Sequence, residues 1–185
     1  MKILKDTVKR LLPAKQLDGV QRYRERQLLR KRLELFTKMP LNQAFTHIYD
    51  RRLWGEALEH SPFFSGPGSH DERTVSCYEN AVVEFIHSLD AKPDVVDLGC
   101  GDFSVGSHIR PLCRNYIACD IVEPLIEFNR KEYESQNVDF RVLDFTRDRI
   151  PSCEVLFLRQ VLQHLSNKHI KKALPKLVSC CKYLV

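Results

Sequence analysis

The stretch 95–103 constrains the fold of this chain more than any other. It opens with two valines, which are typical of a buried strand, and the acid Asp97 follows them at once. Gly99 and Gly101 come next, separated by one residue, so the backbone can turn sharply and a ligand can approach it closely. Helical spacing resumes near position 105. The pattern predicts the first strand, loop and helix of a nucleotide-binding α/β sheet.

The glycine spacing differs from the dinucleotide-binding fingerprint G-x-G-x-x-G. The third glycine of that fingerprint would fall at position 104, where this chain has Ser104, and the next glycine is Gly106. Because the third glycine is absent, the spacing argues against the cradling of a pyrophosphate. Asp97, two residues before the first glycine, suits a cationic ligand better than a phosphate.

The sequence Asp97-Leu-Gly-Cys-Gly101 resembles motif I of the class I S-adenosylmethionine-dependent methyltransferases. The resemblance implies an α/β fold with a doubly wound, mainly parallel sheet of Rossmann-like type. It also implies S-adenosylmethionine as cofactor, a molecule that carries both an ammonium and a sulfonium group. Asp97, Gly99 and Gly101 would then surround its methionine portion.

Two further strands end in acids. Residues 116–120 form the second predicted strand, and Asp120 closes it, 19 residues after Gly101. A carboxylate at this place can accept both hydroxyls of a ribose, in NAD enzymes and methyltransferases alike, although it can also be an acid at the start of the next helix. The third predicted strand, 138–145, carries Asp144 and Phe145. The resemblance assigns these two residues to the adenine, and by itself Asp144 is equally well a turn acid.

The fourth predicted strand, 154–158, is apolar, as a central parallel strand should be. The residues after it are similar to the family's post-strand-four motif, whose side chains line the sulfonium end of the cofactor and the acceptor entrance. Gln160 and His164 are our candidates near the transferred methyl group. His164 can act as a general base for a hydroxyl or amine acceptor, and the alternative is a structural histidine. A helix capped by Ser166 or Asn167 and a fifth strand over 180–185 complete the pattern.

The segment 40–76 changes character and is rich in aromatic residues. It contains the loop Ser65-Gly-Pro-Gly-Ser69, which can offer backbone N–H groups to a carboxylate or can be a plain surface turn. The order of its aromatic residues and glycines resembles the lead-in of a group of bacterial small-molecule and sugar-modifying methyltransferases. In that group the segment caps the cofactor pocket. A helix with one apolar face is predicted over 75–90.

Residues 1–40 are predicted to form a basic helical arm, and residues 41–185 the methyltransferase domain. The arm holds 12 basic and four acidic residues, a net charge of +8, whereas the whole chain carries +5. Such an arm can pack on its own domain, lie on an acidic membrane surface or bind a partner. Only two aromatic residues, Tyr23 and Phe36, accompany the charges, which argues against nucleic acid.

The seven cysteines are odd in number and include no C-x-x-C pair, so the sequence predicts neither a disulfide framework nor a metal site. Reduced cysteines indicate the cytoplasm. The chain has no run of 18 apolar residues and no signal-peptide pattern at its start.

The family's full sheet has seven strands, and this sequence covers the motifs only up to the opening of the fifth. We therefore expect a C-terminally incomplete domain: either the gene product is shortened or interrupted, or a partner chain or a second copy completes the sheet. The predicted function is methyl transfer to a small-molecule, sugar or glycan acceptor. Two alternatives stay open: a non-catalytic, truncated methyltransferase-like subunit that binds a partner or membrane, and an NAD-type oxidoreductase.

Overall fold

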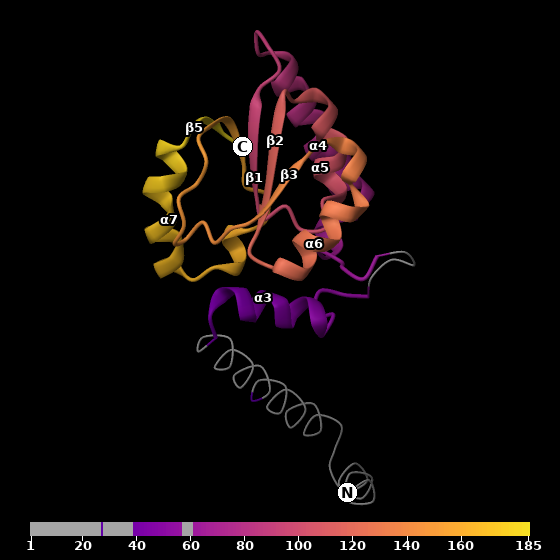
Figure 1. Cartoon of the computed structure of the whole chain (residues 1–185), viewed down its shortest axis with the longest axis vertical. Helices are drawn as coiled ribbons and strands as arrows, with labels where there is room; N and C mark the ends of the chain where they lie inside the picture. Colours follow the sequence, from indigo (N-terminus) through magenta and orange to yellow (C-terminus); the bar gives the residue numbers. More distant parts are fainter. Residues whose placement is uncertain (1–26, 28–38, 57–60) are drawn as a thin grey trace, which may run out of the picture. The chain divides into compact units, whose positions relative to one another are not determined.

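A computed structural model describes Gln27 and residues 39–56 and 61–185 (Figure 1). Residues 41–185 form one compact unit. The basic helical arm expected over residues 1–40 lies, but for three residues, outside the described part of the chain. The helices of the unit are α3 (Leu41–Asp50), α4 (Glu72–His87), α5 (Ser104–Ile109), α6 (Glu123–Glu132) and α7 (Asn167–Ser179). Its strands are β1 (Asp94–Leu98), β2 (Asn115–Asp120), β3 (Asp139–Val142), β4 (Cys153–Phe157) and β5 (Cys181–Leu184).

The five strands make one parallel sheet in the order β3-β2-β1-β4-β5. The chain first proceeds from β1 outward through β2 and β3, and then returns to the other side of β1 with β4 and β5. The structure thus confirms the predicted doubly wound sheet. The direction of winding reverses between β1 and β4, and ligands of such sheets bind outside the carboxyl ends of the strands at this point.

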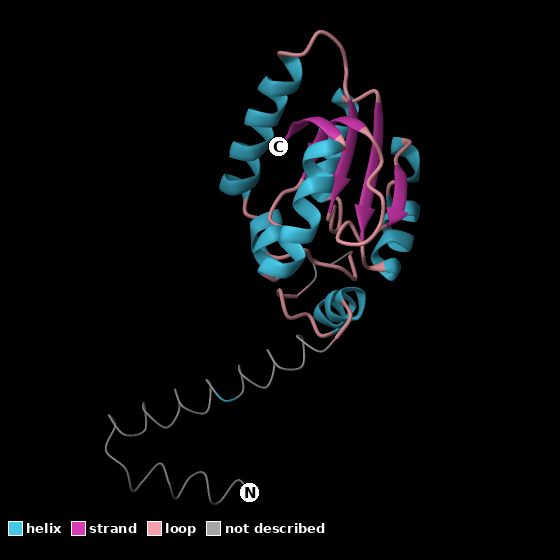
Figure 2. Cartoon of the chain, turned by 90° about the vertical axis from the view of Figure 1, so that its left-hand side faces the viewer, coloured by secondary structure: helices cyan, strands magenta, loops and turns pink. Residues whose placement is uncertain are grey.

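Helices cover both faces of the sheet, as Figures 1 and 2 show. The first face packs on α4, α5 and α6 through a core that includes Val82, Val95 and Ile126. The second face packs on α7, where Leu177 and the β1 residue Val96 have no exposed surface. Neighbouring residues of β1 serve opposite faces, and both faces are covered, which explains the continuous apolar character of this strand.

Several element boundaries differ by a few residues from the sequence prediction, and the start of α4 and the end of β3 have identifiable causes. Helix α4 begins at Glu72, because the carboxylate of Asp71 accepts hydrogen bonds from the backbone N–H and hydroxyl of Thr74 and caps the helix there. Strand β3 ends at Val142, because Asp144 already closes a turn with Thr146. Helix α7 extends to Ser179 despite its internal Pro175. Ser166 caps α7 as predicted, and β5 is present.

In the described residues, no helix is both long enough and apolar enough to cross a membrane.

Candidate functional site

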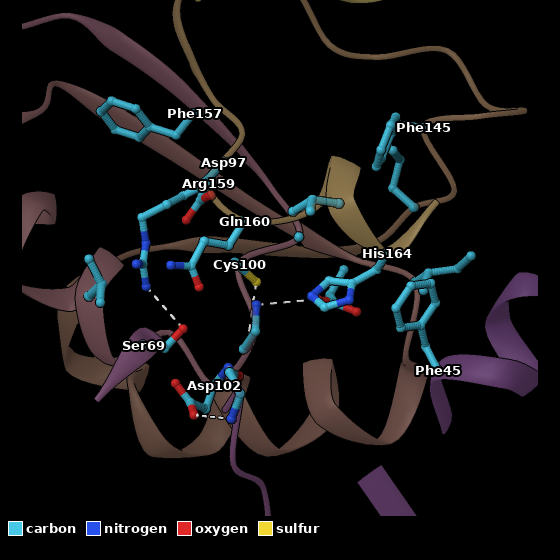
Figure 3. A pocket seen from close by; sticks show the side chains of 18 of the residues that line it. Phe45, Ser69, Asp97, Cys100, Asp102, Phe145, Phe157, Arg159, Gln160 and His164 are labelled. Atoms are coloured by element: carbon cyan, nitrogen blue, oxygen red, sulfur yellow. Dashed lines mark hydrogen bonds between the residues drawn. The ribbon is translucent and has the colours of Figure 1, made fainter. Parts of the chain in front are cut away.

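A pocket lies at the carboxyl ends of β1, β2 and β4, and α3 with the loop 61–71 contributes to its walls. The pocket lining includes all eight site residues predicted from the sequence: Asp97, Gly99, Gly101, Asp120, Asp144, Phe145, Gln160 and His164. Figure 3 shows several of these side chains pointing toward one another. Residues separated by more than 60 positions in the sequence thus meet at one end of the sheet.

The glycine turn after β1 depends on backbone angles that only glycine adopts freely. Gly99 and Gly101 have φ values of 76° and 57°. A Cβ atom on Gly99 would lie 2.4 Å from a methyl group of Val161, and one on Gly101 would lie 2.4 Å from the hydroxyl oxygen of Ser65. Both glycines are therefore required by conformation and by the close approach of neighbouring segments.

Two side chains, one in α6 and one directly after the helix, hold the carbonyl groups of this turn. The Asn129 amide Nδ2 donates to the Gly101 carbonyl oxygen at 2.7 Å, and the Tyr133 hydroxyl donates to the Asp102 carbonyl oxygen at 3.1 Å. Asn129 and Tyr133 are four residues apart and so lie on the same side of the helix. The turn is thus fixed from outside the pocket, by side chains that the pocket lining does not include.

Asp97 and Asp120 are buried carboxyl groups at the ends of adjacent strands. Burial raises the pKa of Asp97 to about 7, although a hydrogen bond from the Tyr116 hydroxyl and the positive charge of Arg159 act in the opposite direction. Burial also raises the pKa of Asp120 to about 6, against hydrogen bonds from the backbone N–H groups of Val122 and Gly101. Buried carboxylates that ionise near neutral pH favour a ligand that supplies positive charge or hydrogen-bond donors.

Asp102 ties the glycine turn to the loop above the pocket, a role that the sequence analysis missed. Its Oδ2 atom accepts a hydrogen bond from the backbone N–H of Ser65 at 2.9 Å and lies 2.8 Å from His70 Nε2. The Ser65 hydroxyl oxygen in turn accepts from the backbone N–H of Asp102 at 2.7 Å. Although burial acts in the opposite direction, the contacts with His70 and Ser65 hold the pKa of Asp102 below its usual value. The carboxylate that accepts a hydrogen bond from a backbone N–H group of the 65–69 loop is therefore the side chain of Asp102.

Aromatic side chains from the segment 40–76 form a wall of the pocket. The Tyr49 hydroxyl bonds to the Ser65 hydroxyl at 3.1 Å, and the ring of Tyr49 lies edge-on to Trp54 with centroids 5.1 Å apart. The imidazole of His164 contacts Trp54 at 5.2 Å and Phe45 at 6.5 Å between ring centroids. Burial lowers the pKa of His164, so this imidazole is neutral at pH 7. Described residues of this segment thus line the pocket.

Arg159 also lines the pocket, and the sequence analysis gave it no role although it precedes Gln160 directly. Its guanidinium donates to the Gly68 carbonyl oxygen at 3.0 Å and to the Ser69 hydroxyl at 2.9 Å (Figure 3). Its Cζ atom lies 5.2 Å from the centre of the Tyr78 ring. The signal that could have found Arg159 is a basic residue two positions after the buried strand β4, among motifs that are otherwise acidic.

Asp144 closes a turn, which is one of the two interpretations that its sequence position allowed. Its Oδ1 atom accepts hydrogen bonds from the backbone N–H and the hydroxyl of Thr146, as in an ordinary strand-end turn. Its Oδ2 atom lies 3.7 Å from the Arg147 Nε atom. Phe145 is buried in the core beneath α7, and its backbone N–H bonds to no described residue. No group of three or more potential metal ligands is found among the described residues.

Comparisons with known proteins found one family model and a set of solved structures with a similar fold. A family model described as "Methyltransferase domain" matches residues 95–183. Among similar solved structures is N-methyltransferase NodS from Bradyrhizobium japonicum WM9 in complex with S-adenosyl-l-homocysteine, with a TM-score of 0.51 and 13% identity over 57% of this chain and 56% of that one. Another is magnesium protoporphyrin IX methyltransferase (ChlM) from Synechocystis PCC 6803 with bound SAH, with a TM-score of 0.59 and 16% identity over 78% and 69%. At these identities the likeness establishes the fold, and the chain spans little more than half the length of NodS. A search of curated protein sequences gave no match.

Proposed function

We propose that this chain is a class I S-adenosylmethionine-dependent methyltransferase, which binds S-adenosylmethionine in the pocket described above and transfers its methyl group to a small-molecule, sugar or glycan acceptor. The match of residues 95–183 to a methyltransferase family model supports the proposal. One observation carries the proposal. The acid near the end of β1, the glycine turn, the acid that ends β2 and the Asp144–Phe145 pair after β3 all line one pocket at the carboxyl edge of the sheet.

Asp120, which would bind the ribose, can accept further hydrogen bonds. Each carboxylate oxygen of Asp120 accepts one hydrogen bond from the backbone, one from Gly101 and one from Val122. A carboxylate oxygen has room for about two acceptor contacts, so each oxygen can take a ribose hydroxyl in addition. Hydrogen bonds from the ribose hydroxyls would also lower the pKa of this carboxyl group, which burial raises.

The adenine and methionine portions fall on the strands to either side. The Asp144 Oδ2 atom forms an ion pair with Arg147 at 3.7 Å but accepts no hydrogen bond from a described residue, so it can accept one from an exocyclic amine. The Phe145 N–H is available to a ring nitrogen. Asp97, a buried carboxyl two residues before the glycine turn, would bind the ammonium group. We propose this assignment because the ribose position at β2 leaves the adenine toward β3 and the amino-acid end toward β1.

The chemistry that the cofactor supplies is an electrophilic methyl group on sulfur with a thioether leaving group. The chain has to hold an acceptor atom in line with that methyl, and positioning of this kind accounts for most of the catalysis. His164 lies among Phe45 and Trp54 at the edge of the pocket, where their rings provide an apolar surface for an acceptor. Because burial keeps His164 neutral, it can accept a proton from a hydroxyl or amine acceptor, while the Gln160 amide can orient that group.

Calorimetric titration of the full chain with S-adenosylhomocysteine tests the cofactor site. We expect saturable binding that Asp120→Ala weakens by about 100-fold or more, because two hydrogen bonds to a charged group are lost at about 1.5–3 kcal/mol each. The matched control is Asp139→Ala, which removes an exposed carboxylate at the start of β3. Asp120→Asn, with circular dichroism as a check on folding, separates loss of binding from loss of structure.

Unchanged affinity in folded Asp120→Ala would refute the proposed site. If the folded wild-type chain bound no S-adenosylhomocysteine but bound NAD in the same calorimeter, the oxidoreductase alternative would replace the proposal. If it bound neither, the non-catalytic subunit would replace it. In that case mass spectrometry of co-purified chains identifies the partner.

A further inference from the structure

Arg159 is the one lysine or arginine among the described residues that line the pocket, whereas four aspartates share that lining. The four aspartates alone would favour a positively charged ligand. The presence of one basic side chain among them therefore calls for a separate explanation. Its guanidinium is held at three points, by the Gly68 carbonyl, the Ser69 hydroxyl and the face of the Tyr78 ring. Arginine stacked on an aromatic ring and bonded to a loop has a fixed orientation.

The sheet topology places Arg159 beside Asp97. Strands β1 and β4 are neighbours, with Asp97 in register with Phe157, and Arg159 follows Phe157 by two residues. Figure 3 shows the Asp97 carboxylate and the Arg159 side chain next to each other. The two charges also interact, since the positive charge of Arg159 lowers the pKa of Asp97 against the effect of burial.

Neither charged group is saturated by its partners. Asp97 accepts one side-chain hydrogen bond, from Tyr116, and Arg159 donates two. A guanidinium has five N–H donors, so three N–H groups of Arg159 have no partner among the described residues. The pocket therefore presents an unfilled carboxylate and an unfilled guanidinium side by side.

This pair of charges matches the free end of an amino acid, in which an ammonium and a carboxylate share one carbon atom. Resting on the proposed function, we propose that Arg159 binds the α-carboxylate of S-adenosylmethionine while Asp97 binds its α-ammonium. With the ribose on Asp120 at the end of β2, the amino-acid end crosses β1 toward β4, where Arg159 stands. The guanidinium offers two parallel N–H groups, the geometry that a carboxylate takes.

Two titrations of the same protein isolate the carboxylate contact. One uses S-adenosylhomocysteine, and the other uses its decarboxylated analogue, which keeps the adenosine, the thioether and the primary amine. We expect wild type to prefer S-adenosylhomocysteine, and Arg159→Ala to weaken it by about 10- to 100-fold, the range of a hydrogen-bonded charge pair. The same substitution should leave the affinity for the analogue within about threefold. Arg159→Lys should restore part of the preference, because it keeps the charge and loses the bidentate geometry.

The matched control is Ser69→Ala, which removes one hydrogen bond from Arg159 to the loop and leaves its charge in place. If Arg159 only holds the loop, Arg159→Ala will weaken both ligands equally, and the inference is wrong. It is also wrong if Arg159→Ala changes neither titration, as expected if Arg159 binds an anionic group of the acceptor. In both cases wild type still binds S-adenosylhomocysteine and depends on Asp120, so the proposed function survives. Wild-type binding of neither ligand would refute the proposed function itself, and this inference with it.

Discussion

Replacing Gly101 with alanine tests whether the loop 61–71 is docked on the glycine turn as the structure has it. Gly101 has a φ of 57°, which costs a non-glycine residue about 1–2 kcal/mol. The new methyl carbon would lie 2.4 Å from the Ser65 hydroxyl oxygen and 3.0 Å from the Ser65 Cβ. Because this Cβ contact involves a carbon next to the backbone, rotation of the side chain does not relieve it, and the loop has to move.

Movement of Ser65 breaks the hydrogen bonds that its hydroxyl makes with the Asp102 N–H at 2.7 Å and the Tyr49 hydroxyl at 3.1 Å. At about 0.5–1.5 kcal/mol for each bond, the substitution should lower the free energy of unfolding by about 2–5 kcal/mol in all. Urea denaturation of the full chain, followed by fluorescence of Trp54 beside the loop, measures this change. The control is Gly68→Ala, whose methyl would meet only the end of the exposed Gln160 side chain and should cost under about 1 kcal/mol.

A double-mutant cycle with Ser65→Gly separates strain from collision. In the Ser65→Gly background, Gly101→Ala meets no side chain at residue 65, so its cost should fall to the backbone strain alone, about 1–2 kcal/mol. Equal costs of Gly101→Ala in both backgrounds would refute the close contact between residues 65 and 101. A cost below about 0.5 kcal/mol in the wild-type background would refute the left-handed conformation of Gly101 as well.

Two further predictions concern the acids of the site. The pKa values of Asp97 and Asp120 are raised from 3.8 to about 7 and about 6, so the folded chain binds more protons than the unfolded chain between about pH 4 and pH 7. The stability that these protonated carboxyl groups contribute is therefore complete below pH 4 and is lost as the pH rises to 7. In urea titrations at several pH values, the free energy of unfolding of Asp97→Asn should depend less on pH than that of wild type. Asp102→Ala should lower the free energy of unfolding by about 2–4 kcal/mol, because it removes the partners of His70 and of the Ser65 N–H from a buried place. His70→Ala should cost less in the same assay, because Asp102 keeps its bonds to Ser65 and Ser104, and a larger loss for His70→Ala would contradict the central position of Asp102.

The strands and most helices could be predicted because local signals coincide with what the sheet requires. The two valines before Asp97 lie in the central strand, whose faces are both covered, so an apolar run was sufficient evidence for β1. The acids at the ends of β2 and β3 could be placed together because parallel strands bring their carboxyl ends to one edge. Where a side chain set the boundary, prediction was less exact: Asp71 starts α4 early, and Asp144 shortens β3.

The contacts between the loop 61–71 and the sheet could not be predicted from the sequence. Ser65 and Asp102 are 37 residues apart, and no periodicity relates them. Their meeting depends on the path of the intervening helix α4, and small changes of that path would separate them. The role of Arg159 could not be predicted for a related reason. It depends on Tyr78 in α4 and on Asp97 in β1, and only the folded sheet brings these residues close to Arg159.

The same tertiary contacts explain why the two ends of the pocket differ in composition. On the β2 and β3 side, Asp120 and the Asp144–Phe145 pair use local turns, so their polar groups can be found in the sequence. On the β1 and β4 side, Asp97 and Arg159 are opposite charges whose orientation depends on Tyr116 and on the Gly68–Ser69 turn, both distant in sequence. A ligand with a heterocycle at one end and a zwitterion at the other satisfies both sides at once. A dinucleotide would place its phosphates against the glycine turn, which begins two residues after the buried carboxyl of Asp97, so the charges at this end favour the amino-acid-bearing cofactor over NAD.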